Sequence, residues 1–178
     1  YAEAAEFMKN VVKIHDVNGG KRFEKAKGFD TVAANANLIV ANTSYYQGKY
    51  AEAIPLLISV KNNPITQTAS VYESLIKAYN EEKKSAEAFA TIQEARKQFP
   101  NDVILRNVEL NYYIASGKQE ELVKKLEEAA TKEPDNADIQ YNLATTYLGM
   151  ATPKDGKKPA NAAELITKSE SAFQNALK

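Results

Sequence analysis

Apolar residues recur at helical spacing between Val71 and Pro100. A first set comprises Tyr72, Leu75, Ile76 and Tyr79, and a second comprises Ala88, Phe89, Ile92 and Ala95. Steps of three and four residues place each set on one face of a helix. The polar stretch Glu81–Lys84 separates the two sets. The pattern predicts an antiparallel helical hairpin, which needs neighbours to cover its remaining apolar face.

The same pattern repeats along the chain, and a proline closes each copy. Pro64, Pro100 and Pro134 lie 36 and 34 residues apart. Each proline ends a helical pattern, because proline lacks an N–H and disfavours α geometry in the residue before it. Small residues are expected where helices approach closely, at Ala41, Ala53, Ala88, Ala95, Ala129 and Ala144. Large residues are expected to fill the space between hairpins, at Leu57, Tyr79, Ile92, Tyr113, Leu126 and Tyr147.

Four copies in register resemble the tetratricopeptide repeat (TPR) family. Its pattern is an aromatic residue, Leu-small, Tyr, a small residue, an aromatic residue and a closing Pro over about 34 residues. The resemblance runs from Asn35 to the C-terminus, with departures at Ile76 and Leu110, where Gly or Ala is usual, and in the lack of Trp. It implies an all-α fold of the α-α superhelix type, a right-handed solenoid of antiparallel helix hairpins.

The expected organisation is one solenoid domain of five segments. N-terminal helices, a partial repeat or cap plus the start of a long helix, precede four repeats; the bounds are 1–34, 35–66, 67–100, 101–134 and 135–178. A helix is predicted over Glu3–Asp16, and Lys21–Gln47 is predicted as one helix or as two joined near Gly28. Asp30-Thr31 is a candidate cap, as is Asn101 or Asp102, by residue type.

The fourth repeat contains an insertion, at about residues 151–160, where the other copies have a short turn. Its polar, basic residues between Pro153 and Pro159 predict an exposed segment. It is either a contact loop or a tolerated insertion. The second interpretation is favoured, because lengthening a surface loop costs little entropy.

Composition limits the partners. The 178 residues include 23 acidic and 23 basic side chains, and zero net charge argues against nucleic acid or an anionic membrane, which call for a basic face. No apolar run approaches the ~20 residues that span a bilayer. The chain contains no Cys and starts at Tyr1 rather than Met. We therefore expect its natural N-terminus to be missing, and we take the bacterial periplasm or cell envelope as a hypothesis for its location.

Candidate chemistry is sparse. The one histidine, His15, precedes Asp16 near the end of a predicted helix, where an imidazole can meet backbone carbonyls. A catalytic triad would also need a nucleophile and an oxyanion site. Acidic residues form no shared cluster for a metal, so neither a cofactor nor catalysis is expected. The charges at Glu120–Lys124 and Glu121–Lys125 predict helix-surface ion pairs on a solvated face.

With catalysis and metal binding not expected, the remaining function is recognition of another protein. The resemblance implies a concave groove lined by the first helix of each hairpin. The corresponding residues here are Asn42, Tyr45, Glu73, Lys77, Asn107, Asn111, Tyr141, Asn142 and Thr145. Asn side chains both donate and accept, so a row of them can pair with the backbone of an extended peptide. The alternative is that they are solvated helix positions. Some family members clamp a C-terminal carboxylate; Asn42 matches that pattern, but Leu38, Ser74, Ile104 and Val108 do not, so this mode is not expected.

The prediction is a non-catalytic scaffold that binds a peptide or partner protein in the groove. The alternative is an assembly module that self-associates through uncapped solenoid ends, with Tyr1, Phe7, Phe173 and Leu177 buried in a partner. An enzyme would require a catalytic part in flanking sequence.

Overall fold

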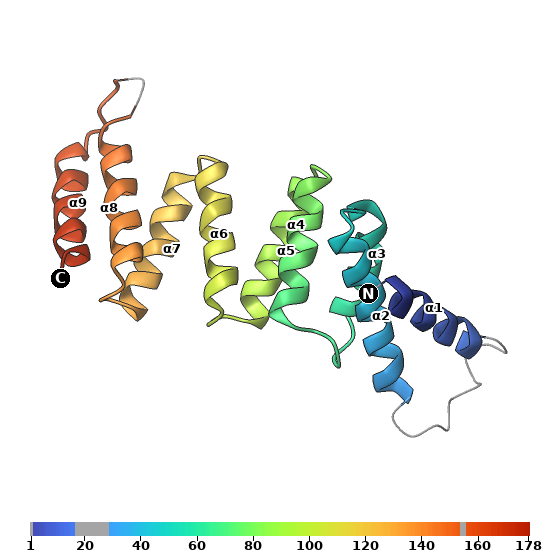
Figure 1. The fold of residues 1–178 in the computed structure, drawn as a ribbon. Coiled ribbons are helices and arrows are strands. Elements are labelled where there is room, and N and C mark those ends of the chain that lie inside the picture. The colour runs from blue at the N-terminus through green and yellow to red at the C-terminus, as the bar shows by residue number, and fades with distance from the viewer. Residues whose placement is uncertain (1, 17–28, 154–155) are drawn as a thin grey trace. The chain divides into compact units, whose positions relative to one another are not determined.

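The computed structural model describes residues 2–16, 29–153 and 156–178, and every regular element in these ranges is an α-helix (Figure 1). In chain order these are α1 (Ala2–Asp16), α2 (Phe29–Tyr46), α3 (Tyr50–Lys61), α4 (Ala69–Glu81), α5 (Ser85–Gln98), α6 (Val103–Ala115), α7 (Gln119–Lys132), α8 (Ala137–Ala151) and α9 (Ala162–Ala176). The predicted all-α fold class is confirmed.

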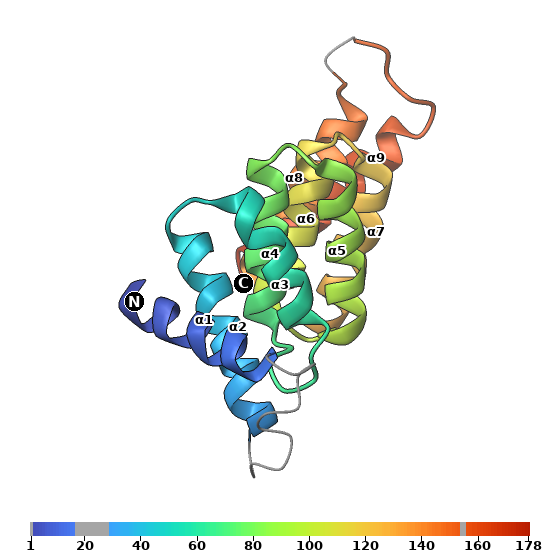
Figure 2. The same ribbon diagram turned by 90° about the vertical axis from the view of Figure 1, so that its right-hand side faces the viewer.

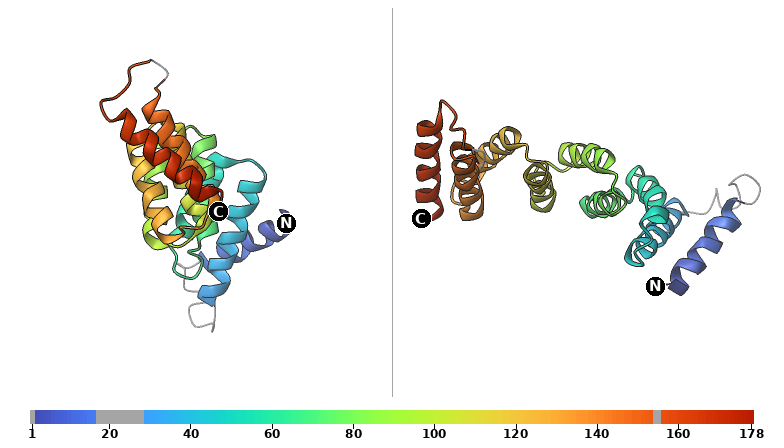
Figure 3. Two further views of the ribbon diagram at one scale, coloured as in Figure 1. Left: turned by 90° about the vertical axis from the view of Figure 1, so that its left-hand side faces the viewer. Right: turned by 90° about the horizontal axis from the view of Figure 1, so that it is seen from above.

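The chain divides into two compact units, Tyr1–Val108 and Glu109–Lys178, and the division falls within α6. In the first unit α2 packs against α1 and α3, and α4 packs against α3 and α5 (Figure 2). In the second unit α8 packs against α7 and α9, and α8 and α9 run side by side (Figure 3). The repeat bounds and the single solenoid domain stay predictions.

The turns inside three hairpins share one geometry. After α2, α4 and α6 the chain takes a positive φ at Gly48 (73°), Lys83 (58°) and Gly117 (68°). The next residue donates its N–H to the carbonyl five positions back at 2.8–3.1 Å, in Lys49→Ser44, Lys84→Tyr79 and Lys118→Tyr113. This is the Schellman bond that ends a helix on a left-handed residue. The sequence repeat is therefore also a repeat of turn geometry.

The ends of the hairpins explain the unequal proline spacing. Phe99 and Glu133, which precede Pro100 and Pro134, end α5 and α7 with nearly equal dihedrals, φ −126° and −132°, ψ 66° and 68°. After α3 the chain instead makes an extra turn, in which the buried Thr66 hydroxyl donates to the Val60 carbonyl at 2.8 Å. That turn accommodates the two additional residues of the first period.

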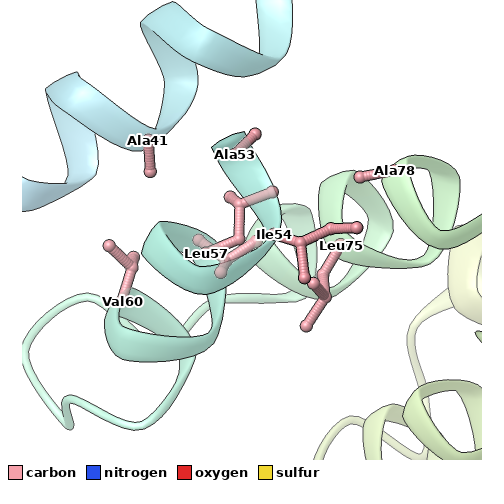
Figure 4. Packing of buried hydrophobic residues seen from close by; sticks show 8 residues of the cluster. Ala41, Ala53, Ile54, Leu57, Val60, Leu75 and Ala78 are labelled. Carbon is pink, nitrogen blue, oxygen red and sulfur yellow. The ribbon is translucent and has the colours of Figure 1, made fainter. Parts of the chain in front are cut away.

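Small and large residues alternate in the core as the repeat pattern predicts. One cluster joins α2, α3 and α4 through Ala41, Ala53, Ile54, Leu57, Val60, Val71, Leu75 and Ala78 (Figure 4). The six predicted small positions are all buried, and so are the large ones except Tyr79, which is partly buried. Alanines where helices face each other allow close approach, and Leu57 and Leu75 fill the space between them.

One of the predicted caps, Asp102, is confirmed, the cap at Asp30-Thr31 is wrong, and the structure adds a cap at Asn136. Asp102 Oδ1 accepts the Leu105 N–H at 2.9 Å, and Asn136 Oδ1 accepts the Ile139 N–H at 3.2 Å. Asp30-Thr31 does not precede a helix, because α2 already begins at Phe29. The rest of the predicted Lys21–Gln47 helix, over residues 21–28, lies outside the described residues.

Candidate binding surfaces

The first unit brings predicted groove residues from α2 and α4 together. The Lys77 amine lies 5.9 Å from the centroid of the Tyr45 ring, so these two side chains join the helices by a cation–π contact. The Tyr45 ring also packs edge-on against Tyr46 at 5.2 Å and Tyr50 at 5.8 Å. Tyr46 is 81% exposed, so this aromatic cluster is open to solvent.

The other predicted residues of this unit differ in their surroundings. Asn42 and Glu73 are half-buried, and Asn107 is exposed. Burial, and then the negative charge of Asp102, raises the pKa of the Glu73 carboxyl. A carboxylate whose charged form is disfavoured gains stability from a cation or an N–H donor. The predicted groove residues of this unit therefore include a half-buried acid as well as neutral amides.

The second unit contains a cavity of about 350 Å³ between α6, α7 and α8, which we call the α6–α8 cavity. Its lining includes Tyr113, Ile114, Leu122, Asn142, Thr145 and Thr146. Tyr113 and Leu122 are buried, but Ile114 is 53% exposed. A large apolar side chain in a concave surface can bury much more area when another chain covers it.

Two of the predicted groove residues of this unit, Asn142 and Thr145, line the cavity, whereas Asn111 and Tyr141 do not. Asn111 is exposed. Tyr141 is 57% exposed and packs edge-on against Phe173 of α9, with centroids 5.9 Å apart. The groove prediction itself is untested by these positions and stays a prediction.

Hydroxyl groups of the α6–α8 cavity are used within α8. The Thr145 hydroxyl donates to the carbonyls of Tyr141 (3.0 Å) and Asn142 (3.1 Å), and the Thr146 hydroxyl donates to the Asn142 carbonyl at 2.6 Å. The two threonines therefore offer a ligand methyl surface and acceptor lone pairs rather than a free donor. The exposed Asn142 amide provides both a donor and an acceptor.

Sequence reasoning missed Ile114, Gln119 and Thr146 as members of this surface. Ile114 directly follows the core residue Tyr113, so it is an isoleucine outside the apolar stripe of its own helix. That offset was the available signal for an apolar contact point. Gln119 begins α7 and borders the cavity only because the tight turn at Gly117 brings it there.

A second cavity of about 460 Å³, which we call the insertion cavity, lies beside the inserted segment of the fourth repeat. Its lining includes Glu120, Glu121, Met150, Pro159, Asn161 and Leu165. Gly117 and Gln119 border both cavities. The described residues of the insertion, 152–153 and 156–161, connect the end of α8 to the start of α9 and project beyond both helices in Figure 1.

Polar side chains also join neighbouring helices, α3 and α4 to α5 in the first unit and α8 to α7 in the second. In the first unit Lys61 Nζ lies 2.6 Å from Glu94 Oε1, which also accepts the Tyr72 hydroxyl at 2.9 Å. In the second unit the Tyr147 hydroxyl donates to Glu127. Burial, the hydrogen bond to Glu127 and its charge raise the pKa of Tyr147.

The predicted solvated face of α7 is only partly correct. Lys125 pairs with Glu109 at 3.5 Å and with Glu128 at 3.6 Å, and not with Glu121. Glu109 is 3% exposed, and an ion pair near a buried carboxylate relieves its desolvation. Residues three and four positions apart were the only partners that the sequence could suggest.

The described residues contain no group of three or more His, Asp or Glu side chains that could hold a metal ion. His15 lies in α1, but its side chain is outside the described part of the chain. Within the same residues, none of the helices combines the length and apolar character needed to cross a bilayer.

Comparisons with known proteins give the class of fold. No family model matches the sequence. Cellulose synthase operon protein C of Pseudomonas fluorescens (strain SBW25) is 27% identical over 155 residues, an alignment that covers 77% of this chain and 12% of that protein. The chain thus corresponds to a small part of that relative's length.

Among solved structures, the chain is similar to YrrB, a TPR protein with an unusual peptide-binding site. The two share 18% identity with a TM-score of 0.53, over 98% of this chain and 88% of that one. The resemblance to TPR proteins is confirmed: this chain has the helical-repeat fold of a TPR protein.

Proposed function

We propose that this chain is a non-catalytic interaction module that binds an extended segment of another protein, and that the α6–α8 cavity is part of its binding site. The observation that carries the proposal is Ile114, which is 53% exposed in a cavity whose rim includes the Asn142 amide. A TPR fold supports protein binding in general, and the peptide-binding site of YrrB shows that a protein of this fold can take a peptide.

The cavity suits an apolar side chain of the bound segment. Its lining includes the buried Tyr113 and Leu122, and the exposed part of Ile114 would be covered on binding. The exposed Asn142 amide can pair with a backbone N–H and C=O of the same segment. Apolar area supplies the affinity, while the amide fixes the direction and register of the peptide backbone.

The test uses a phage-displayed library of random linear dodecapeptides, selected against the wild-type chain. The affinities of enriched peptides are then measured by fluorescence anisotropy for Ile114→Ala and Asn142→Ala. Truncating Ile114 removes three carbons at about 0.8 kcal/mol each, and roughly half of that area is newly buried on binding, so we expect a loss of about 1 kcal/mol. That corresponds to a roughly fivefold weaker Kd.

Ile65→Ala is the matched control, because Ile65 is 49% exposed and borders neither cavity. Its affinity should equal that of the wild type. Enriched peptides that bind Ile114→Ala and Asn142→Ala as tightly as the wild type would remove the α6–α8 cavity from the binding site. A selection that enriches no sequence would overturn peptide binding by this chain.

A second candidate function, self-association, is favoured by apolar residues on α9. Ile166 is 38% exposed and Phe173 is half-buried, and the two lie seven residues apart on one helix face; Leu177 after the helix is 87% exposed. Sedimentation velocity over a range of concentrations tests it. Self-association through this face predicts a mass that rises with concentration and falls to the monomer in Ile166→Ser. A monomer at every concentration removes this candidate.

A further inference from the structure

The insertion cavity has a lining of two kinds. Met150, Pro159 and Leu165 give it an apolar side. Glu120 and Glu121, both exposed in the first turn of α7, give it an acidic side. Pro159 and Asn161 contribute to it from the inserted segment and the start of the last helix, so the insertion builds one wall of the cavity. The hairpin turns at Gly48 and Lys83 have no comparable segment.

A lysine or arginine side chain combines the same two kinds of surface. Its aliphatic stem packs on apolar groups while its charged head stays near carboxylates and water. At about 460 Å³ the insertion cavity has room for one such side chain with solvent. An acidic side chain would meet Glu120 and Glu121, and a purely apolar one would leave both carboxylates beside a desolvating surface.

Positive charge near the cavity does not reverse this preference. Lys118 also borders it, with its amine 5.8 Å from the centroid of the Tyr112 ring, whereas Lys157 and Lys158 of the inserted segment are not among its lining residues. The N-terminus of α7 is equivalent to about half a positive charge. Two full negative charges on Glu120 and Glu121 exceed the sum of these contributions.

The two cavities of the second unit adjoin, because Gly117 and Gln119 border both. An extended segment that fills one can therefore continue into the other across the α6–α7 turn, where Gly117 has no side chain to obstruct it. We propose that the insertion cavity is a specificity pocket that receives a lysine or arginine side chain of the segment bound in the α6–α8 cavity. This inference rests on the proposed function and adds the chemistry of the partner: an apolar residue followed, in one direction, by a basic one.

The test repeats the dodecapeptide selection with the wild-type chain and with Glu120→Gln/Glu121→Gln. Wild type should enrich lysine or arginine at a fixed offset from an apolar residue, and the double variant should lose the basic preference but keep the apolar one. For a fluorescein-labelled wild-type-selected peptide, we expect the double variant to weaken Kd about tenfold. The control is Asp138→Asn/Glu170→Gln, which changes net charge equally at exposed positions outside both cavities and should leave Kd unchanged.

Changes in the peptide separate the contribution of the aliphatic stem of its basic residue from that of the charged head. A peptide with norleucine in place of its basic residue should bind wild type and the Glu120→Gln/Glu121→Gln variant equally, and should retain the part of the affinity that the aliphatic stem supplies. A peptide with alanine there should lose the contribution of the stem as well as that of the charge. Apolar enrichment without a basic position, enrichment of acidic residues, or equal basic enrichment by wild type and the double variant would each overturn the inference while leaving the proposed function intact. A library that enriches nothing would instead overturn the proposed function itself.

Discussion

Removing the Tyr72 hydroxyl should destabilise the first unit measurably, although it deletes one atom. The Tyr72 ring is fully buried at 0% exposure, packs edge-on against Phe99 at 5.7 Å and lies 5.4 Å from the Lys61 amine. Phenylalanine keeps all of these ring contacts. Tyr72→Phe therefore isolates the hydroxyl, which donates to Glu94 at 2.9 Å and accepts from Gln67 at 3.1 Å.

The magnitude follows from the charge of the acceptor. A hydrogen bond to a charged group contributes about 1.5–3 kcal/mol. Glu94 is 42% exposed on its side chain, so water competes for it and the lower part of this range applies. We expect Tyr72→Phe to lower the free energy of unfolding by about 1.5 kcal/mol near neutral pH. Tyr45→Phe, which changes a half-buried tyrosine of the same unit whose hydroxyl has no hydrogen-bond partner in the described structure, is the matched control.

The same contribution should depend on pH. Burial, the hydrogen bond to Glu94 and the Glu94 charge raise the pKa of Tyr72 to about 12, from 10.0. Because the folded state holds this proton more tightly than the unfolded state, the stabilisation is complete below the unfolded pKa and is lost as pH rises through the folded one. Two pKa units correspond to about 2 kcal/mol after discounting for the exposure of Glu94.

The assay is urea unfolding followed by far-UV circular dichroism, for wild type, Tyr72→Phe and Tyr45→Phe, at pH values from neutral to strongly alkaline. The difference between wild type and Tyr72→Phe isolates Tyr72, because the other tyrosines and the lysines titrate equally in both proteins. This difference should fall toward zero between about pH 10 and pH 12. A difference that stays constant across that interval, or a Tyr72→Phe protein as stable as Tyr45→Phe near neutral pH, would refute the reasoning.

Three further changes test local features. Lys83→Gly should stabilise the chain by about 1 kcal/mol in urea unfolding, because Lys83 has a φ of 58° where the equivalent turns have glycine; equal stability would contradict the strain. Asn136→Ala should cost about 1 kcal/mol and Asn136→Ser much less, since only the alanine variant loses the side-chain cap on α8; equal losses would contradict the cap. Thr66→Val should lower the free energy of unfolding by about 1 kcal/mol and raise the amide hydrogen-exchange rate at the C-terminal end of α3, because the buried Thr66 hydroxyl donates to a backbone carbonyl there. Unchanged exchange would show that this hydrogen bond does not stabilise the extra turn.

Helix positions and core residues could be predicted because both follow from local patterns. The spacing of apolar residues defines one face of each helix, and proline and glycine mark the ends. Positions such as Ala41 and Leu57 repeat at the period of the array, so one hairpin predicts the next. The polar break at Glu81–Lys84 predicted a turn there, whereas its left-handed residue at Lys83 is known only from the structure.

The polar networks could not be predicted, because their partners are distant in sequence. Tyr72 and Glu94 are 22 residues apart, and Tyr147 and Glu127 are 20 apart. Their periodicity indicated an apolar role for both tyrosines, and nothing in a helical pattern reveals where a hydroxyl points. The α6–α8 cavity was only half predicted for a similar reason. Asn142 and Thr145 came from the family resemblance, whereas Ile114 belongs to the cavity because no neighbouring helix in the described part of the chain covers it, which a helical pattern does not reveal.

The distribution of charge in the second unit favours recognition by α8. That helix has a single charged residue, Asp138 in its first turn. On the neighbouring helices Lys125 pairs with Glu109 and Lys168 pairs with Glu164 at 2.9 Å, and Glu120 and Glu121 lie at the insertion cavity. The lining of the α6–α8 cavity contains no charged residue, so a peptide bound there would be held by apolar area and amide hydrogen bonds.

This neutrality has a consequence that separates the two cavities. Binding in the α6–α8 cavity should respond little to salt, because no charged pair forms there. Binding of a basic side chain at Glu120 and Glu121 should weaken as salt rises, because the Debye length shrinks from about 10 Å at 0.1 M to about 3 Å at 1 M. A peptide that carries the basic residue should therefore lose affinity with salt, and its norleucine counterpart should not. Equal salt dependence of the two peptides would mean that the acidic wall takes no part in recognition.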